Sequence, residues 1–497
     1  MMKRVTALAG RDRLTAVAIA AAAAFGGIGP GTAKAADLDN LMTLLQDTAD
    51  GSWVKANVNT FASVVPDPAD RAYGYSDSTT VIKAWSGFAW DAKRGDLLLF
   101  GGGHGNYSGN EMYIWDGATG TWGRGSLPSQ VAYAYYPSGD FIALPVDGAM
   151  NAPPSMHTYD NNVYLTASDR FMTLGGPVFN YGGPAAQNPD GSLRPTGPYL
   201  YDPAKADPNK VGGTTGSAVD PNVVGGQMWS NRDTNGSLFV LNTWSGPTTL
   251  SPVDGTTATA VENGKDVVYT TLRGGPSQYL MKYTINDLSN PALDTLTMVG
   301  VTNTQAGAYG AGAFDDERGL YVGLSEYVEA DRAFTVWDTH ATNGGSNYNV
   351  TLAYDVVGAA AFDGNRIGGI DWSESRGAFL VWTGAGDVWE LAAPSSGLIT
   401  DRWTLQLVTD GDSFAAGMKP DGMDPSGVRG KWKYIDNLDA FIALEGNSSG
   451  DVWLYRPLGW VAPAVPEPAS AVLLLGGGIV LLASRRRLPH AKATPTA

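Results

Sequence analysis

One pattern returns along most of this chain: an extended segment, a polar turn, and then four or five apolar residues that often end at glycine. The two clearest copies lie at 87–102 and 163–176. In each copy the turn separates two runs rich in the aromatic and β-branched residues that favour strands. The pattern predicts repeated β-hairpins. No long stretch keeps the 3.6-residue apolar period of an amphipathic helix. The best helical candidate is the short segment at 37–48.

Further copies of this unit are weaker but regularly spaced. Their apolar runs lie at 238–241, 267–271, 320–324, 378–382 and 440–444. An aromatic third strand is expected after most runs, at 112–116, 199–202, 279–283, 334–338, 387–390 and 451–455. Units of about fifty residues with four short strands are typical of β-propellers.

The apolar runs, the paired glycines Gly101 and Gly102, and the tryptophans Trp115 and Trp122 resemble the kelch repeat. The resemblance implies an all-β, kelch-like β-propeller of six or seven four-stranded blades over residues 36–462. Seven runs favour seven blades, but the interval between 238 and 267 is too short for a complete blade. Residues 53–65 precede the first full unit and are expected to close the last blade. A β-sandwich or two jelly rolls is the alternative.

The N-terminus has the three parts of a secretory signal peptide. Basic residues at 3–13 precede an alanine-rich apolar stretch at 14–25, and a small-x-small pattern follows. We predict that residues 1–35 are removed by signal peptidase at the site formed by Ala33, Ala35 and Ala36.

The C-terminus, residues 463–497, has the pattern of a second targeting signal. A proline motif precedes an apolar segment at 469–484, and three arginines follow that segment. The segment is predicted to be a short transmembrane segment, although it is shorter than the roughly 20 residues that span a bilayer comfortably. The motif and the arginines are Val465, Pro466, Glu467, Pro468, Arg485, Arg486 and Arg487. This order resembles the PEP-CTERM sorting signal of Gram-negative bacteria. It implies processing by an exosortase, transient anchoring in the inner membrane, and a cell-surface or extracellular destination. An ordinary tail anchor that obeys the positive-inside rule is the alternative.

Composition narrows the function classes. A formal net charge of −16 argues against nucleic-acid binding, because phosphate contacts need a positive surface. The absence of cysteine excludes thiol nucleophiles and disulfides. It also excludes the cysteine-linked copper site of galactose oxidase, an enzyme built on a kelch propeller. No metal site is assigned and no cofactor is predicted, although an acidic chain leaves room for a divalent cation.

The most unusual loop is glycine-rich and follows the best second strand. It holds the candidate ligand-binding residues His104, Asn106, Tyr107, Asn110 and Glu111. The alternative is a hairpin whose polar side chains bond its own backbone. His157 opens the next unit on an expected innermost strand, which would place it beside the central channel near His104. Metal binding, base catalysis and a purely structural role stay open for His157.

Aromatic residues beside polar or charged ones recur near the starts of units. The candidate ligand-binding residues among them are Trp229, Arg232, Trp372, Lys431 and Trp432. Gathered at one end of the channel, they would form a carbohydrate platform, in which rings stack on sugars and polar groups bond hydroxyls. Packing between blades uses the same residue types and is the alternative.

These features favour an exported binding protein whose partner is an exopolysaccharide or another glycan. Repeated sialidase-type boxes and a Gly-x-Ser-x-Gly elbow are absent, which weakens an enzymatic interpretation. An extracellular carbohydrate hydrolase or lyase on the same face is the first alternative. A structural biofilm-matrix protein that binds other proteins is the second.

Overall fold

A computed structural model describes residues 38–463. Within that range it omits 67–73, 75–79, 136–138, 221, 244–245, 253–254, 275–276, 303–308, 326–332, 341–348, 352, 359, 363–367, 423–425 and 448. The predicted signal peptide, its cleavage site and the sorting signal all lie outside the described residues. Among the residues described, no helix is long and apolar enough to cross a membrane.

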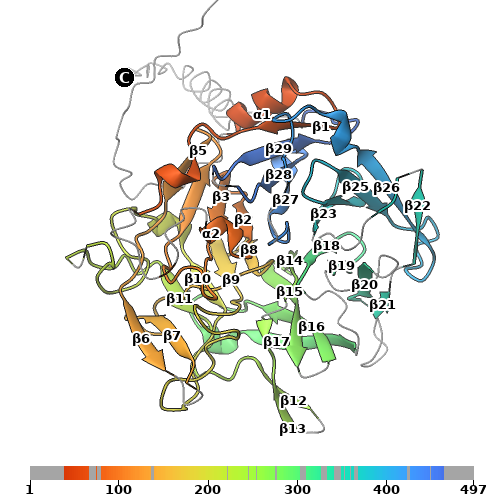
Figure 1. Cartoon of the computed structure of the whole chain (residues 1–497). Helices are drawn as coiled ribbons and strands as arrows, with labels where there is room; N and C mark the ends of the chain where they lie inside the picture. Colours follow the sequence, from red (N-terminus) through yellow and green to blue (C-terminus); the bar gives the residue numbers. More distant parts are fainter. Residues whose placement is uncertain are drawn as a thin grey trace, which may run out of the picture.

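The chain forms a six-bladed β-propeller of small antiparallel sheets (Figure 1). Blade 1 contains β2 (Phe88–Asp91), β3 (Asp96–Leu99), β4 (Tyr113–Asp116) and β5 (Thr121–Arg124). Blade 2 contains β8 (Asn162–Leu165), β9 (Arg170–Thr173), β10 (Tyr199–Tyr201) and β11 (Trp229–Asn231). Blade 3 contains β14 (Thr257–Glu262), β15 (Lys265–Gly274), β16 (Ser277–Thr284) and β17 (Thr295–Thr302).

The second half of the ring repeats this order. Blade 4 contains β18 (Ala311–Asp315), β19 (Leu320–Leu324), β20 (Phe334–Asp338) and β21 (Asn349–Thr351). Blade 5 contains β23 (Gly369–Ser373), β24 (Ala378–Trp382), β25 (Val388–Ala392) and β26 (Trp403–Thr409), with β22 (Tyr354–Val357) added in parallel to β26. Blade 6 contains β27 (Trp432–Ile435), β28 (Ala440–Leu444), β29 (Val452–Arg456) and β1 (Ser52–Lys55).

The repeat pattern located the second and third strands correctly. Six of the seven apolar runs coincide with second strands of blades, and each expected aromatic segment coincides with a third strand. The remaining run, at 238–241, leads into a two-stranded hairpin of β12 (Val240–Thr243) and β13 (Gly246–Thr249), which projects from the rim in Figure 1. The chain enters β14 eight residues after β13, too soon for a full blade, so the ring has six blades rather than seven.

The last blade is closed by the first strand of the chain, as predicted. β1 pairs antiparallel with β29, and Trp53 lies opposite Tyr455. Because an N-terminal strand completes a C-terminal sheet, the ring cannot open without breaking this ladder. The helix α1 (Asp39–Gln46), inside the predicted segment 37–48, buries Leu41 and Leu45 in the core beside this blade.

Tryptophans pack between neighbouring blades, where no backbone ladder runs. The Trp53 ring lies 5.6 Å from Trp382 of blade 5 and 5.6 Å from Trp432 of blade 6, centroid to centroid. Its indole N–H donates to the carbonyl of Gly386 at 2.9 Å. The indole N–H of Trp122 in blade 1 likewise donates to the carbonyl of Gly450 in blade 6 at 2.9 Å. Each ring therefore buries apolar area and satisfies its polar atom across a blade boundary.

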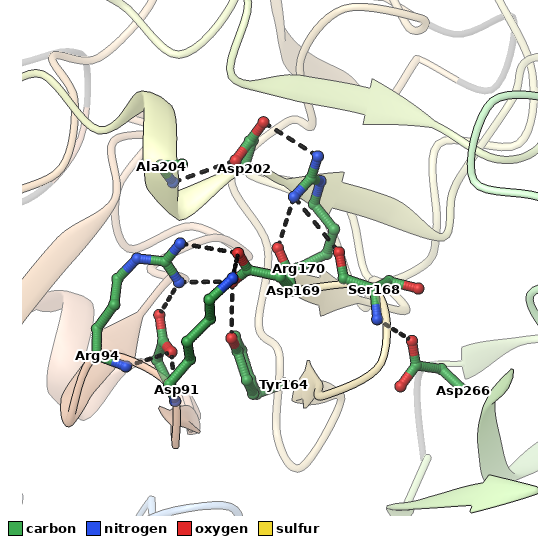
Figure 2. Close-up of polar contacts among 10 residues, drawn as sticks. Asp91, Arg94, Tyr164, Ser168, Asp169, Arg170, Asp202, Ala204 and Asp266 are labelled. Atoms are coloured by element: carbon green, nitrogen blue, oxygen red, sulfur yellow. Dashed lines mark hydrogen bonds and ion pairs between the residues drawn. The ribbon is translucent and has the colours of Figure 1, made fainter. Parts of the chain in front are cut away.

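On one face of the propeller, ion pairs and hydrogen bonds join the turns between the first and second strands of neighbouring blades (Figure 2). Arg94 of blade 1 forms an ion pair with Asp91 of the same turn at 2.7 Å and a second ion pair with Asp169 of blade 2 at 2.6 Å. The Asp266 carboxylate of blade 3 accepts the backbone N–H of Ser168 at 2.7 Å. These contacts link three successive blades.

Additional elements connect the blades. They are the helix α2 (Thr80–Lys83), the hairpin of β6 (Val131–Tyr135) and β7 (Phe141–Pro145), and the 3₁₀ turns η1 (Phe61–Ser63), η3 (Pro203–Lys205), η5 (Pro291–Leu293), η7 (Gly411–Ser413) and η8 (Asp436–Leu438). Blade 1 is thus separated from blade 2 by an inserted hairpin that belongs to neither sheet.

Candidate functional site

The innermost strands of the six blades line the propeller axis, and the chain reverses sharply just before several of them. Contacts join β2, β8, β14, β18, β23 and β27 in sequence around the ring. Residues that precede these strands therefore converge at one end of the central channel. We call this end the channel mouth.

The glycine-rich loop joins β3 to β4 at the channel mouth. His104 is exposed at its tip and adopts a left-handed backbone conformation, with φ of 51°. Its Nδ1 lies 3.1 Å from the carbonyl oxygen of Tyr181, in the loop that follows β9. This contact fixes the ring on the neighbouring blade while leaving it accessible to solvent.

His157 lies directly beside this loop. The rings of His104 and His157 meet edge to face at 5.0 Å, and His157 is 1 % exposed. His157 is not on a strand, contrary to expectation, because the innermost strand of blade 2 begins only at Asn162. Its Nε2 lies 2.8 Å from Oδ1 of Asn106, which requires Nε2 to carry the proton that it donates.

The environment of His157 favours its neutral form. Burial lowers its pKa to about 2, and electrostatic interaction with the neighbouring His104 and Arg429 lowers it further. The neutral ring stacks on Trp85 at 4.7 Å, with 28° between the two planes. Trp85 is only half-buried, so part of its indole remains available at the surface.

The aromatic cluster continues across the channel mouth. Tyr159 meets Tyr309 of blade 4 edge to face at 5.4 Å. The guanidinium of Arg429, at the start of blade 6, lies 4.9 Å from the centre of the Tyr159 ring. Arg429 also donates to the carbonyls of Ser426 and Tyr309, so it ties blade 6 to blade 4 across the axis.

Four bulky residues of this cluster share an unusual backbone conformation. Trp85, Tyr159, Tyr309 and Arg429 all have φ between 46° and 55°, and each lies two or three residues before an innermost strand. Left-handed conformations are genuine outliers for bulky residues. The repeated reversal turns these four side chains toward the mouth.

A buried charged cluster lies behind the aromatic residues. Asp160, fully buried, accepts the backbone N–H groups of Thr257 at 2.9 Å and Gly312 at 2.7 Å. Its other oxygen lies 3.2 Å from Nζ of Lys433. Burial alone would lower the pKa of Lys433. The negative charges of Asp160 and, to a lesser extent, Asp371 have the larger combined effect, so the pKa of Lys433 is raised. One carboxylate therefore joins blades 2, 3, 4 and 6.

The remaining predicted residues of the glycine-rich loop point into the core. The hydroxyls of Tyr107 and Tyr113 donate to Oε1 of buried Glu111 at 3.0 Å and 2.6 Å, and burial raises the pKa of Glu111. Asn110 is also buried, where it donates to the carbonyl of Pro153 and accepts the backbone N–H of Ser129. In this conformation these groups hold the loop in place and do not face the mouth.

The predicted platform residues do not gather at one end of the channel. Trp229 is buried between Phe100, Phe171 and Tyr201, where blades 1 and 2 meet. Arg232 forms a buried ion pair with Asp294 at 2.7 Å and joins blade 2 to blade 3.

The candidates in blades 5 and 6 are also packed. The Trp372 ring lies against Phe379, with Arg318 5.0 Å from its centre. Trp432 is completely buried and stacks on Phe441 at 4.5 Å. Buried Lys431 donates to the carbonyl of Gly427 at 3.1 Å. These side chains are buried and therefore inaccessible to a ligand in this conformation.

Sequence reasoning missed Tyr159, Tyr309 and Arg429. A usable signal was present: at three of the four reversals a glycine follows the bulky residue by one or two positions, as Gly87, Gly310 and Gly430. Within the described part of the chain, no three histidine or acidic side chains come close enough together to hold a metal ion.

Comparison with known proteins adds little to this description. No protein-family profile and no curated protein matches the chain. A Bacteroides thetaiotaomicron protein of unknown function is similar in structure, with 10 % identity over 75 % of this chain and 91 % of that one, at a TM-score of 0.29. Saccharomyces cerevisiae Sqt1 is similar at 9 % identity over 78 % of this chain and 99 % of its own, at a TM-score of 0.30. The class defined here, a six-bladed β-propeller, rests on the chain's own strand order.

Proposed function

We propose that this protein is an exported, kelch-type propeller that binds a glycan at the channel mouth. The observation that carries the proposal is the convergence of Trp85, Tyr159, Tyr309 and Arg429 in left-handed conformations at that mouth. Such conformations cost on the order of 1–3 kcal/mol each and tend to persist at functional sites.

The chemistry of the mouth suits a sugar. Trp85 offers part of an aromatic face, stacked on His157 so that it is held rigidly. His104, exposed, and Asn106, half-buried, both contact the His157 ring on which Trp85 stacks, and they add ring nitrogen and amide groups to the mouth. A rigid ring flanked by a few polar groups is a common way to fix the orientation of a small polar ligand.

Binding is better supported than catalysis by His157. A general base works best when its pKa lies near the operating pH, whereas burial lowers the pKa of His157 to about 2. Export and surface delivery, inferred from the two terminal signals, would place the protein beside extracellular polysaccharide. The choice of a polysaccharide partner therefore rests on this destination and not on the fold, because a propeller hosts many functions.

A glycan array with the purified protein tests the proposal, followed by calorimetry on any ligand found. Trp85→Ala and His104→Ala should each weaken binding about tenfold, which corresponds to about 1.4 kcal/mol. His340→Ala is the matched control, because His340 is also exposed but lies after β20, away from the mouth.

Two results would contradict the proposal. One is an array on which no glycan binds. The other is a bound glycan whose affinity is equal for the wild type and the two mouth variants. If chromatography of the incubated glycan shows shortened products, the protein is an enzyme rather than a binding protein.

A further inference from the structure

The hairpin β6–β7 exposes aromatic rings outside the six blades. Tyr133 and Tyr135 are 48 % and 66 % exposed. They are two positions apart on β6, so both side chains lie on one face of the hairpin. Phe141, directly opposite Tyr135 in the register, belongs to the same group.

These three rings form a compact surface, here called the hairpin platform. Tyr133 stacks on Phe141 at 5.1 Å with 18° between the planes, and Tyr135 lies 5.4 Å from Phe141. The Trp53, Trp229 and Trp432 rings at blade boundaries are buried, whereas this platform keeps two tyrosines at the surface. Exposed apolar clusters of this kind usually mark an interaction site.

The platform is continuous with the channel mouth. Phe141 meets the edge of Phe179 at 6.4 Å, and the backbone N–H of Phe179 donates to the carbonyl of Ser155, two residues before His157. Two residues after Phe179, the Tyr181 carbonyl contacts His104. One loop therefore connects the platform to the histidine pair.

We propose that the hairpin platform is a second subsite, and that the protein binds one neutral polysaccharide chain across the platform and the mouth. This inference rests on the proposed glycan-binding function. A chain that contacts both sets of rings gains affinity because its second contact is intramolecular. Tyrosine rings suit such a chain, since each offers an apolar face and a hydroxyl.

The charge of this region favours a neutral chain over an acidic one. Residues 131–145 contain no lysine or arginine, and their only ionisable acid is Asp140. At the mouth, the cations Arg429 and Lys431 are buried and bonded to backbone carbonyls. A chain of uronic acids would bring many carboxylates to a protein of net charge −16 without exposed cations on the platform to neutralise them.

The test compares short and long neutral gluco-oligosaccharides with oligouronates, by calorimetry on the purified full-length protein. We expect affinity to rise with the length of the neutral chain. The double variant Tyr133→Ser/Tyr135→Ser should bind the long neutral chain at least about tenfold more weakly, down to the level of the short one. It should bind the short chain like the wild type. Leu398→Ser, at another residue that is 59 % exposed, is the matched control.

The outcomes separate the two proposals. If the wild type binds short glycans and loses them with Trp85→Ala, but the tyrosine variant binds long chains normally, the second subsite is wrong and the proposed function stands. Preference for oligouronates, or affinity independent of chain length, would also overturn the subsite. If no glycan binds the wild type, the proposed function itself fails. Circular dichroism of the tyrosine variant should match the wild type, because both side chains are exposed.

Discussion

Replacing Asp160 with asparagine tests whether one buried carboxylate holds four blades together. The wild-type side chain accepts two backbone N–H groups and the ammonium of Lys433. Asparagine keeps the size but removes the charge, and its amide NH₂ would face donors instead of accepting from them. The substitution therefore leaves Lys433 without its closest counter-ion.

The expected cost follows from burial. Removing one member of a buried ion pair costs about 3–5 kcal/mol, because the remaining charge is left uncompensated. Asp160 is fully buried, but the Lys433 side chain is 14 % exposed and gains some relief from water. We therefore expect a loss of about 3 kcal/mol, at the lower end of that range. With a urea slope of about 3 kcal/mol/M, the unfolding midpoint should fall by about 1 M.

Urea unfolding followed by tryptophan fluorescence measures this midpoint. Asp355→Asn is the matched control, because Asp355 also pairs with a cation, Arg402, but both side chains are largely exposed. The control should unfold at the wild-type midpoint, since exposed ion pairs contribute little. Adding Lys433→Met to Asp160→Asn should recover part of the loss, because it removes the unpaired charge. Equal midpoints for Asp160→Asn and Asp355→Asn would refute this account.

Two other substitutions probe the pH response and the ring closure. Burial raises the pKa of Asp371 to about 6, although Lys433 counteracts it. In the unfolded chain this carboxyl ionises near its usual pKa of about 4, so its contribution to stability is lost as the pH rises from about 4 to about 6. Asp371→Asn should flatten that part of the pH profile of the urea midpoint, and an unchanged profile would contradict the shift. Trp53→Ala should cost about 3–5 kcal/mol, the usual loss for a buried tryptophan, because it empties the junction between blades 5 and 6. Thermal unfolding checks this, and a melting temperature equal to that of the wild type would show that β1 closes the ring without Trp53.

Local repetition allowed much of the propeller to be predicted. The apolar runs that became β3, β9, β15, β19, β24 and β28 are second strands because each follows a polar turn and precedes an aromatic strand. The closing role of β1 was predictable for a similar reason, since a strand-like segment before the first full unit has no other sheet to join. The blade count was not decided by the runs, because the run at 238–241 has the right composition for a blade but forms only a hairpin.

The candidate site was predicted only in part. Proximity of His104 and His157 was expected from their places in consecutive units, and their rings are in contact. The aromatic residues were harder to assign, because tryptophan serves equally well between blades and at a surface. Trp432 is buried among rings of its neighbours, whereas Trp85 is only partly buried beside His157, and no local pattern distinguishes these two environments.

The sequence by itself determined the repeating unit, because that unit depends on residues close together in the chain. It also indicated the closing strand, because a strand-like segment before the first full unit has no other sheet to join. The tertiary structure alone decided that six units close the ring, that Asp160 bonds groups from three other blades, and that the exposed tyrosines of the hairpin adjoin the channel mouth. Those contacts join residues far apart in the sequence. Their partners are fixed only when every blade has taken its place around the axis, because burial and hydrogen bonding depend on the whole assembled ring.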